Sequence, residues 1–181
     1  LEGNAGYATS VALVSQSGEV LLGAVYDPVE DRLFEAVQGR GVTLNGEMWT
    51  PDNNKPKPGR ITCFADRSLE KHPCFEEFQA YFDIRFVGGA VVNSLHVLAD
   101  PTSVYLKPPK PSMGGCAIWD LAAVSLMLNE CGGCVSSFDA QPLLFNRPES
   151  LFFNDTGLAL GGDDVDMEAV FSFLSAIGDP K

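Results

Sequence analysis

The residues best suited to chemistry lie near the middle of the chain, where an acidic side chain precedes a long apolar run. Asp120 is followed by apolar residues over 121–128, and Gly132 comes soon after them. An aspartate at a helix start caps the helix by accepting a hydrogen bond from an amide two or three residues on, here residue 122 or 123. It can also hold a hard cation, because an ionised carboxylate has roughly four lone-pair sites. The pattern predicts a buried helix over 120–131, with Asp120 as a cap, a metal ligand or both.

Two glycine-containing stretches could bind an anion. Glu2-Gly3-Asn4 combines a carboxylate, a glycine and a polar side chain, and Gly88-Gly89-Ala90 opens a predicted helix. Backbone amides at a helix N-terminus point outward and attract phosphate or carboxylate groups. Each stretch also reads as a plain turn, and from these residues alone both interpretations stay open.

The cysteines provide a second possible chemistry. Cys131-Gly-Gly-Cys134 has the spacing of a redox or zinc pair, but no second such pair is present and the histidines, His72 and His96, are distant in sequence. The total of five cysteines is odd, and a chain of this length does not need disulfides to fold. We therefore expect reduced thiols in a cytoplasmic protein and keep a thiol-redox protein as an alternative.

The charge balance limits the class of partner. The chain has 12 basic and 24 acidic residues, which gives a net charge of −12. Such a chain does not neutralise the phosphates of a nucleic acid polymer or an anionic membrane, so neither is expected as a partner. A small phosphorylated substrate stays possible if a metal ion supplies positive charge. No apolar run reaches the roughly 20 residues that a membrane-spanning helix needs.

The hydrophobic pattern divides the chain into two lobes. Residues 1–59 are β-rich and end in an exposed, proline-containing connector over 50–59, whereas residues 60–181 alternate between strand and helix patterns. We expect the lobes to meet over Asp120. The predicted strands cover 9–15, 20–26, 31–37, 42–44, 60–65, 84–87, 103–106, 135–138 and 143–145, with another near Leu158. Besides the helix over 120–131, helices are predicted over 74–82, 90–99 and 165–177.

The two ends of the central helix carry a family resemblance. Trp119-Asp120-Leu-Ala-Ala, continuing to Asn129-Glu130-Cys-Gly-Gly, resembles a signature of the inositol monophosphatase superfamily. These proteins are magnesium-dependent, lithium-sensitive phosphomonoesterases and include the 3′(2′),5′-bisphosphate nucleotidases. Further segments fit the order of the family, and they cover 1–4, 10–14, 23–28, 39–41, 44–46 and 87–90.

The resemblance implies an α+β fold, a layered α/β/α/β/α sandwich of the sugar-phosphatase type, with the N-terminal helical layer missing from this chain. It also implies that Asp120 and Glu2 hold Mg²⁺ and that the amides of Gly3 and Asn4 hold the phosphate. Asp120 and Asn4 are then the catalytic residues. The reaction is attack on phosphorus by a metal-activated water.

The resemblance further implies that Gly88 and Ala90 contact the group that bears the phosphate. Lys107 lies near the place where inositol-preferring members carry an acidic residue. A lysine there favours a second phosphate or sulfate on the substrate, unless it simply faces solvent. The implied partner is a small-molecule phosphate ester, and homodimers are common in families of this kind.

Some positions depart from the family pattern. Glu2 stands where aspartate is usual, and Asn4 replaces a serine or threonine whose hydroxyl helps orient the attacking water. In the family, an Asp-Pro pair directly before the segment matched by residues 1–4 and a Glu-Glu pair further upstream also contact metal, and both positions precede Leu1 of this sequence. If the chain begins at Leu1, a poor metal site and an exposed apolar face are expected. The alternative function is therefore a catalytically weakened or silent relative that binds a phosphorylated ligand or a partner.

Overall fold

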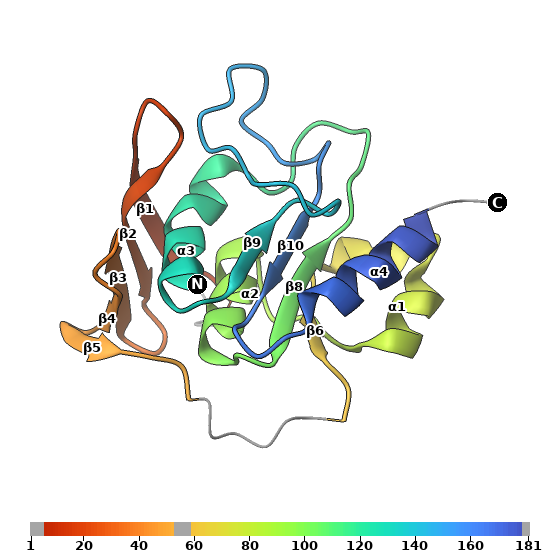
Figure 1. The fold of residues 1–181 in the computed structure, drawn as a ribbon, viewed down its shortest axis with the longest axis horizontal. Helices are drawn as coiled ribbons and strands as arrows, with labels where there is room; N and C mark the ends of the chain where they lie inside the picture. The colour runs from red at the N-terminus through yellow and green to blue at the C-terminus, as the bar shows by residue number, and fades with distance from the viewer. Residues whose placement is uncertain (1–5, 53–58, 179–181) are drawn as a thin grey trace.

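The computed structural model describes residues 6–52 and 59–178 as alternating layers of sheet and helix. Two five-stranded sheets are separated by a helical layer, and further helices cover the outer face of the second sheet (Figure 1). The α+β layered sandwich expected from the sequence is confirmed. Most of the connector predicted over 50–59, and the stretch Glu2-Gly3-Asn4, lie outside the described residues.

The first sheet is an antiparallel meander in which each strand pairs with the next along the chain. Its strands are β1 (Thr9–Val14), β2 (Val20–Asp27), β3 (Arg32–Val37), β4 (Val42–Leu44) and β5 (Glu47–Trp49). The first four were predicted to within one or two residues. The fifth was not, although Asn45 and Gly46, both at positive φ, form the tight turn that pairs β4 with β5.

The second sheet is mixed and has the order β7-β6-β8-β10-β9. Its strands are β6 (Thr62–Phe64), β7 (Asp83–Arg85), β8 (Ser103–Lys107), β9 (Cys134–Ser136) and β10 (Leu158–Gly161). β6 runs parallel to β7 and β8, while β10 is antiparallel to both its neighbours. The prediction of a strand over 143–145 is wrong, because these residues lie in a loop. Phe145 anchors this loop by packing against Phe153, with the ring centroids 5.7 Å apart.

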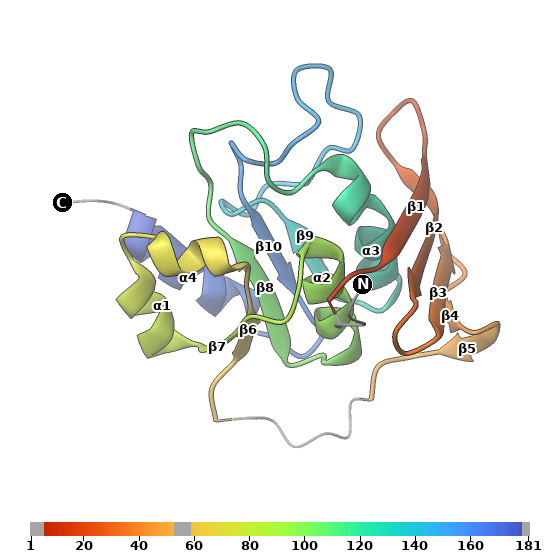
Figure 2. The ribbon, with the colours of Figure 1, turned by 180° about the vertical axis from the view of Figure 1, so that it is seen from behind.

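Helices occupy both faces of the second sheet. Helices α2 (Ala90–Ala99) and α3 (Ile118–Glu130) lie between the two sheets, and their apolar side chains join one core with residues of both sheets (Figures 1 and 2). On the opposite face lie the 3₁₀ turn η1 (Arg67–Lys71), α1 (Phe75–Tyr81) and α4 (Met167–Gly178), over a second core that includes Phe78, Phe82 and Leu174.

Helix α3 is the central element, as predicted, but it begins earlier than expected. All its residues from Leu121 to Leu128 are buried. The helix starts at Ile118, so Asp120 is its third residue, and one carboxylate oxygen accepts a hydrogen bond from the Ala117 N–H at 2.8 Å. The prediction that Asp120 caps the helix by accepting the amide of residue 122 or 123 is therefore wrong. Asp120 instead lies in the first turn, and its side chain accepts the backbone amide of Ala117, the residue before the helix. Gly132, at φ +82°, follows the helix as predicted.

Close packing between α3 and the first sheet depends on a glycine in β2. A Cβ atom at Gly23 would lie 2.7 Å from Ala123 Cα and 2.9 Å from the Ala123 carbonyl oxygen, both backbone atoms. We expect Gly23→Ala to lower the free energy of unfolding by about 2–3 kcal/mol, because strand and helix must move apart. Urea unfolding measures this. Gly59→Ala is the control, because Gly59, like Gly23, has no positive φ and its Cβ would meet nothing within 4 Å.

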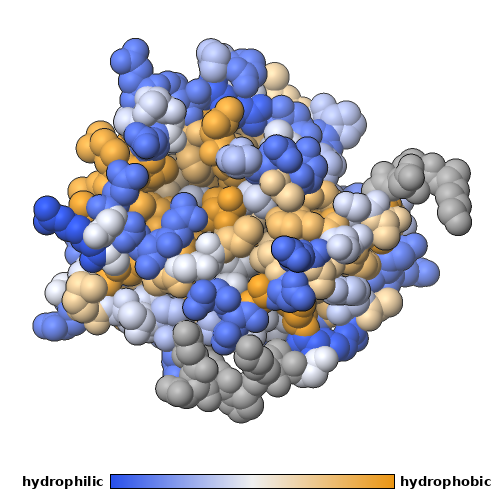
Figure 3. Space-filling model, viewed as in Figure 1, coloured by the Kyte–Doolittle hydropathy of each residue, from blue (hydrophilic) through white to orange (hydrophobic). Residues whose placement is uncertain are grey.

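The outer face of the first sheet carries exposed apolar side chains. Because side chains alternate along a strand, every second residue points away from α3. The exposed members are Val11, Leu13, Leu22, Tyr26, Val37 and Met48. Figure 3 shows apolar atoms on the side of the molecule that this sheet occupies. The outer face of the first sheet is thus apolar at these positions.

Candidate functional site

The candidate site lies where β6 and β8 end and α2 and α3 begin. Asp66 follows β6, Lys107 ends β8, Gly88 and Gly89 precede α2, and Asp120 lies in the first turn of α3. The carboxyl ends of parallel strands meet at one edge of a sheet, and here that edge faces the positive ends of two helices. This topology brings together residues that are far apart in sequence.

Asp66 is the hub of the site. One of its carboxylate oxygens accepts hydrogen bonds from Tyr105 Oη at 3.2 Å and Asn93 Nδ2 at 3.1 Å. The other forms an ion pair with the Lys107 ammonium. Asn93 is fully buried, and its Nδ2 also donates to the Gly88 carbonyl at 3.1 Å. The network therefore ties the turn before α2 to the end of β8.

Sequence reasoning missed Asp66 and Asn93. Asp66 is the first charged residue after the buried strand predicted over 60–65, and this position was the available signal. The partners of Asp66 come from α2 and β8, so its role depends on how the strands are ordered.

The Asp66 network should stabilise the fold measurably. Both side chains of the ion pair are largely buried, at 20% exposure for Asp66 and 16% for Lys107. Asp66→Ala leaves three donors without their acceptor, so we expect a loss of about 2–3 kcal/mol in urea unfolding. Adding Lys107→Met should recover about 1 kcal/mol, because it removes the unpaired charge.

A surface ion pair provides the matched control for the Asp66→Ala variant. Asp83 and Arg85 form a pair at 2.9 Å with more than half of each side chain exposed. Asp83→Ala should therefore cost less than about 0.5 kcal/mol. Equal losses from Asp66→Ala and Asp83→Ala would contradict the role assigned to Asp66.

Asp120 shares this end of the molecule with Asp66. Burial raises the pKa of Tyr105 well above its usual value, and the neighbouring Cys116, Asp66 and Asp120 raise it further. Burial likewise raises the pKa of the Cys116 thiol, with Asp120 contributing and Lys107 opposing. Tyr105 and Cys116 thus feel the charge of both carboxylates, while Asp120 itself stays half-buried beside the exposed Trp119.

The described residues do not by themselves form a complete metal site. In residues 6–52 and 59–178, no three His, Cys, Asp or Glu side chains are grouped so that they could hold a metal ion. Asp120 offers one carboxylate, with one oxygen used for the helix cap. The predicted second ligand, Glu2, and the phosphate-binding pair, Gly3 and Asn4, lie outside the described residues.

The start of the described chain nevertheless reaches the turn before α2. A Cβ atom at Gly6 would lie 3.1 Å from the Val87 carbonyl oxygen and 3.6 Å from Gly88 Cα. Gly88 is itself confined, since a Cβ there would lie 2.9 Å from the side chain of Val92. The predicted substrate residue Gly88 is therefore next to Gly6.

Lys107 is not a simple solvent-facing lysine. Besides its ion pair with Asp66, its side chain lies near that of Lys110 beside Gly115. A Cβ atom at Gly115 would be 3.6 Å from Lys107 Cε and 3.6 Å from Lys110 Nζ. Two basic side chains thus converge next to the loop that leads to α3.

The Cys131–Cys134 pair has poor properties for redox chemistry. Burial, with smaller contributions from the carboxylates of Glu130 and Asp163, raises the pKa of the Cys131 thiol to about 11. Burial also raises the pKa of Cys134. Because the thiolate is the reactive form, these thiols are weak nucleophiles near neutral pH.

The raised pKa predicts slow alkylation of Cys131. Near pH 8, a thiol of pKa about 11 has about 100-fold less thiolate than one at the ordinary value of 9.0. We expect iodoacetamide, followed by mass spectrometry, to label Cys131 about 100-fold more slowly in the folded chain than in urea. The rate should increase with pH up to about 11. Rapid labelling of folded Cys131 at neutral pH would revive the redox alternative.

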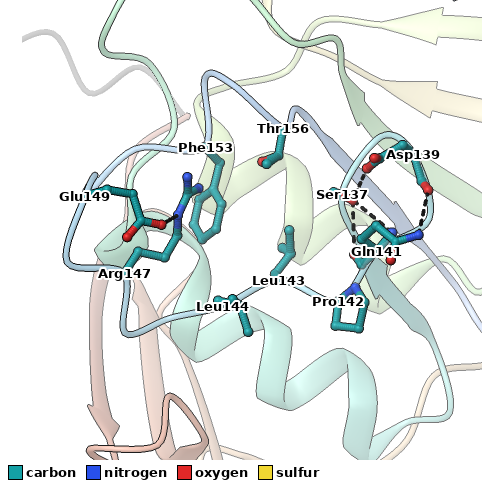
Figure 4. Close-up of a pocket in the computed structure, with 10 residues that line it drawn as sticks. All are labelled: Ser137, Asp139, Gln141, Pro142, Leu143, Leu144, Arg147, Glu149, Phe153 and Thr156. Atoms are coloured by element: carbon teal, nitrogen blue, oxygen red, sulfur yellow. Dashed lines mark hydrogen bonds and ion pairs between the residues drawn. The ribbon is translucent and has the colours of Figure 1, made fainter.

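A cavity of about 250 Å³ lies elsewhere, under the loop between β9 and β10 (Figure 4). Arg147 lines the cavity, and its guanidinium group forms ion pairs with Asp155 at 2.6 Å and Glu149 at 3.4 Å. Leu143 and Phe153 supply apolar walls. None of the predicted site residues lines this cavity, so we treat it as separate from the candidate site.

Comparison with known proteins identifies the family. The profile of the inositol monophosphatase family matches residues 1–164. Among curated proteins, the chain is 31% identical over 160 residues to Nus factor SuhB of Xylella fastidiosa, which covers 83% of this chain and 56% of that protein. It is 30% identical over 141 residues to Nus factor SuhB of Haemophilus influenzae, covering 74% and 50%. The chain thus spans about half the length of these relatives.

Solved structures show the same fold. SaIMPase-II bound to 2′-AMP superposes with a TM-score of 0.74 at 21% identity, covering 97% of this chain and 64% of that one. The Thermotoga maritima IMPase superposes with a TM-score of 0.69 at 20% identity, covering 93% and 61%. Because the family profile matches residues 1–164, the chain belongs to the inositol monophosphatase family.

Proposed function

We propose that this chain supports the magnesium-dependent hydrolysis of a small phosphate monoester. The observation that carries the proposal is the position of Asp120, a half-buried carboxylate in the first turn of α3 whose charge acts on Tyr105 of the Asp66 network. In this proposal Asp120 and Glu2 are the metal ligands, Asp120 and Asn4 act in catalysis, and Gly3 and Asn4 hold the phosphate. Magnesium suits such a site because it prefers oxygen ligands, keeps several waters and often needs few protein carboxylates.

The N-terminus of α2 supports binding of an anion. The first amides of a helix have no partner within the helix, and the helix dipole adds positive potential there. Gly89 precedes α2 in an extended conformation, and Gly88 is held by its hydrogen bond from Asn93. Gly88 and Ala90 are therefore proposed to contact the group that bears the phosphate.

Lys107 favours a substrate that carries a second anionic group. Lys107 and Lys110 converge beside Gly115, and Asp66 neutralises only one of the two charges. An inositol monophosphate or a 3′(2′),5′-bisphosphate nucleotide remains the substrate class that we propose, with the lysines favouring the latter. Related proteins were solved with 2′-AMP and with inositol monophosphate bound, both as complexes of SaIMPase-II.

A second candidate function is binding without catalysis. The curated relatives bear the name Nus factor SuhB, which is not the name of a phosphatase. Glu2 and Asn4 also depart from the family pattern in the segment that would hold metal and phosphate. A weakened or silent member that binds a phosphorylated ligand or a partner would combine these features.

Location in the cytoplasm is also part of the proposal. Among the described residues, no helix is long and apolar enough to cross a membrane.

Phosphate release measured on a substrate panel separates the two functions. The panel contains inositol 1-phosphate, 2′-AMP and adenosine 3′,5′-bisphosphate, each with and without magnesium and with added lithium. The enzyme proposal predicts magnesium-dependent release that lithium inhibits, fastest with the bisphosphate. Saturable binding of these compounds without any metal-dependent turnover would overturn the enzyme proposal and favour the silent binder.

A further inference from the structure

A small cavity of about 110 Å³ lies between the turn η1 and the loop that follows β8. Parallel β6 and β8 end at the same edge of the second sheet, which brings these two segments together. Leu69, Pro108 and Pro109 form the apolar part of its wall. The cavity is smaller than the roughly 300–1,000 Å³ of pockets that enclose a whole small molecule, so it suits a small ion or one substituent of a larger ligand.

Every polar side chain that lines this cavity can donate a hydrogen bond. Two are the ammonium groups of Lys107 and Lys110, and the others are the hydroxyl of Ser68 and the imidazole of His72. His72 Nδ1 accepts the Cys74 N–H at 3.3 Å, so the imidazole proton is on Nε2 and Nε2 is a donor. No aspartate or glutamate of the described residues lines the cavity, although the chain has a net charge of −12. The lining therefore favours an anion.

The two lysines bring positive charge to one place. A Cβ atom at Gly115 would be 3.6 Å from Lys107 Cε and 3.6 Å from Lys110 Nζ. Lys107 is held by its ion pair with Asp66, but an ammonium group has three N–H donors and can serve a second acceptor. Lys110 has no ion pair among the described residues. Because like charges repel at this range, an anion between the two ammonium groups would be stabilising.

The backbone of the loop that carries the lysines is fixed by its neighbours. A Cβ atom at Gly157 would lie 2.7 Å from the Lys107 carbonyl oxygen and 2.8 Å from Pro109 N, so the two segments are in close contact. The Lys110 amide donates to the Asn154 carbonyl at 2.7 Å. Both lysine side chains therefore start from a defined backbone, and binding an anion orders less of the chain than it would on a free loop.

We propose that this cavity binds a tetrahedral oxyanion, a phosphate or sulfate group. Lys107 and Lys110 supply charge-assisted hydrogen bonds, and Ser68 and His72 supply neutral ones. Several donors around one small space suit a group with several acceptor oxygens better than they suit a halide. The oxyanion is either a free ion or the second anionic group of the substrate, and the latter source rests on the proposed function.

Sulfate titration followed by NMR of the histidine side chains tests the proposal on the full chain, without magnesium, phosphate buffer or phosphate ester. Of the two histidines in the sequence, His72 lines the cavity, whereas His96 packs on Phe64 with ring centroids 4.9 Å apart. We expect a saturable shift of the His72 signals at millimolar sulfate and no shift of the His96 signals. Chloride at the same ionic strength should shift neither, and His96→Gln assigns the signals.

Lys110→Met should weaken sulfate binding by about tenfold, since it removes one charge-assisted contact. Lys110 is exposed and contacts Asn154 through its backbone, so this variant should fold normally. The matched control is Lys71→Met, which removes the same charge from an exposed lysine of η1 that does not line the cavity. It should change sulfate affinity by about twofold or less, because solvent and salt screen an exposed charge.

Competition for the cavity separates the two sources of the oxyanion. Displacement of sulfate by adenosine 3′,5′-bisphosphate at lower concentration than by 2′-AMP would assign the cavity to the second phosphate of the substrate. Sulfate that stays bound alongside the bisphosphate would assign it to a free ion. Either result supports the oxyanion site, and neither involves phosphate release. Failure of this proposal is therefore distinguishable from failure of the phosphatase proposal.

Three results would overturn the oxyanion site. One is the absence of a saturable His72 shift at millimolar sulfate, which would mean that the cavity holds only water. Another is an equal shift with chloride, which would show that the cavity does not recognise the oxygens of the anion. The third is equal weakening by Lys110→Met and Lys71→Met, which would indicate general charge attraction rather than binding in the cavity.

Discussion

Asp120→Asn is expected to lower magnesium-dependent phosphate release by at least about 100-fold, since a bound metal contributes several kcal/mol to such a reaction. The substitution keeps an oxygen that can accept the Ala117 N–H, so the cap at the start of α3 is retained. What is lost is the negative charge proposed to hold the metal. Initial rates of phosphate release at saturating magnesium measure the effect.

The control for this variant is Asp120→Ala. It removes both the charge and the helix cap, so it should lose the same activity and, in addition, about 1 kcal/mol of stability. If Asp120→Asn released phosphate at the rate of the unmodified chain while remaining folded, Asp120 would have a capping role only. In that case the position of Asp120 could no longer support the proposed function.

Glu130→Ala is expected to lower the free energy of unfolding by about 3 kcal/mol. The two Glu130 carboxylate oxygens accept the amides of Gly39 and Gly41, both at 2.7 Å, across a sequence separation of about 90 residues. Hydrogen bonds to a charged acceptor contribute about 1.5–3 kcal/mol each, and solvent access to the turn reduces this value. Urea unfolding followed by circular dichroism provides the measurement.

Glu130→Gln should give an intermediate loss, because the amide side chain keeps one acceptor oxygen but turns a donor toward the second amide. Gly39 and Gly41 both have positive φ, so the turn cannot readily change shape to find other partners. A loss below about 0.5 kcal/mol for Glu130→Ala, as for an ordinary surface substitution, would show that the turn does not depend on this contact.

Glu130 illustrates how far the sequence can predict the structure. Its place in the Glu-x-Gly-Gly pattern was recognisable, and so was Gly39-Arg40-Gly41, but nothing local indicated that the two segments touch. Both hydrogen bonds depend on α3 packing across β1, β2 and β3. By contrast, both ends of helix α2 were predicted correctly. Its apolar residues recur at helical spacing, and Gly89 and Asp100 stand directly before and after them.

The errors have similar physical causes. Strand β5 was missed because three residues are too few to show the alternation of apolar and polar side chains that marks a strand. The residues over 143–145 were predicted as a strand because a loop segment that packs into the core is as apolar as a short buried strand. Asp120 was predicted with the wrong cap partner, since a helix boundary is uncertain by one or two residues from sequence alone. Asp66 and Asn93 required the strand order.

The central claim is that Asp120 takes part in holding a divalent ion at the start of α3. Calorimetric titration of magnesium into the chain, compared with Asp120→Asn, tests it without reference to any substrate. We predict saturable binding that Asp120→Asn weakens by at least about tenfold. Equal magnesium affinity in both proteins, or no saturable binding in either, would contradict the claim.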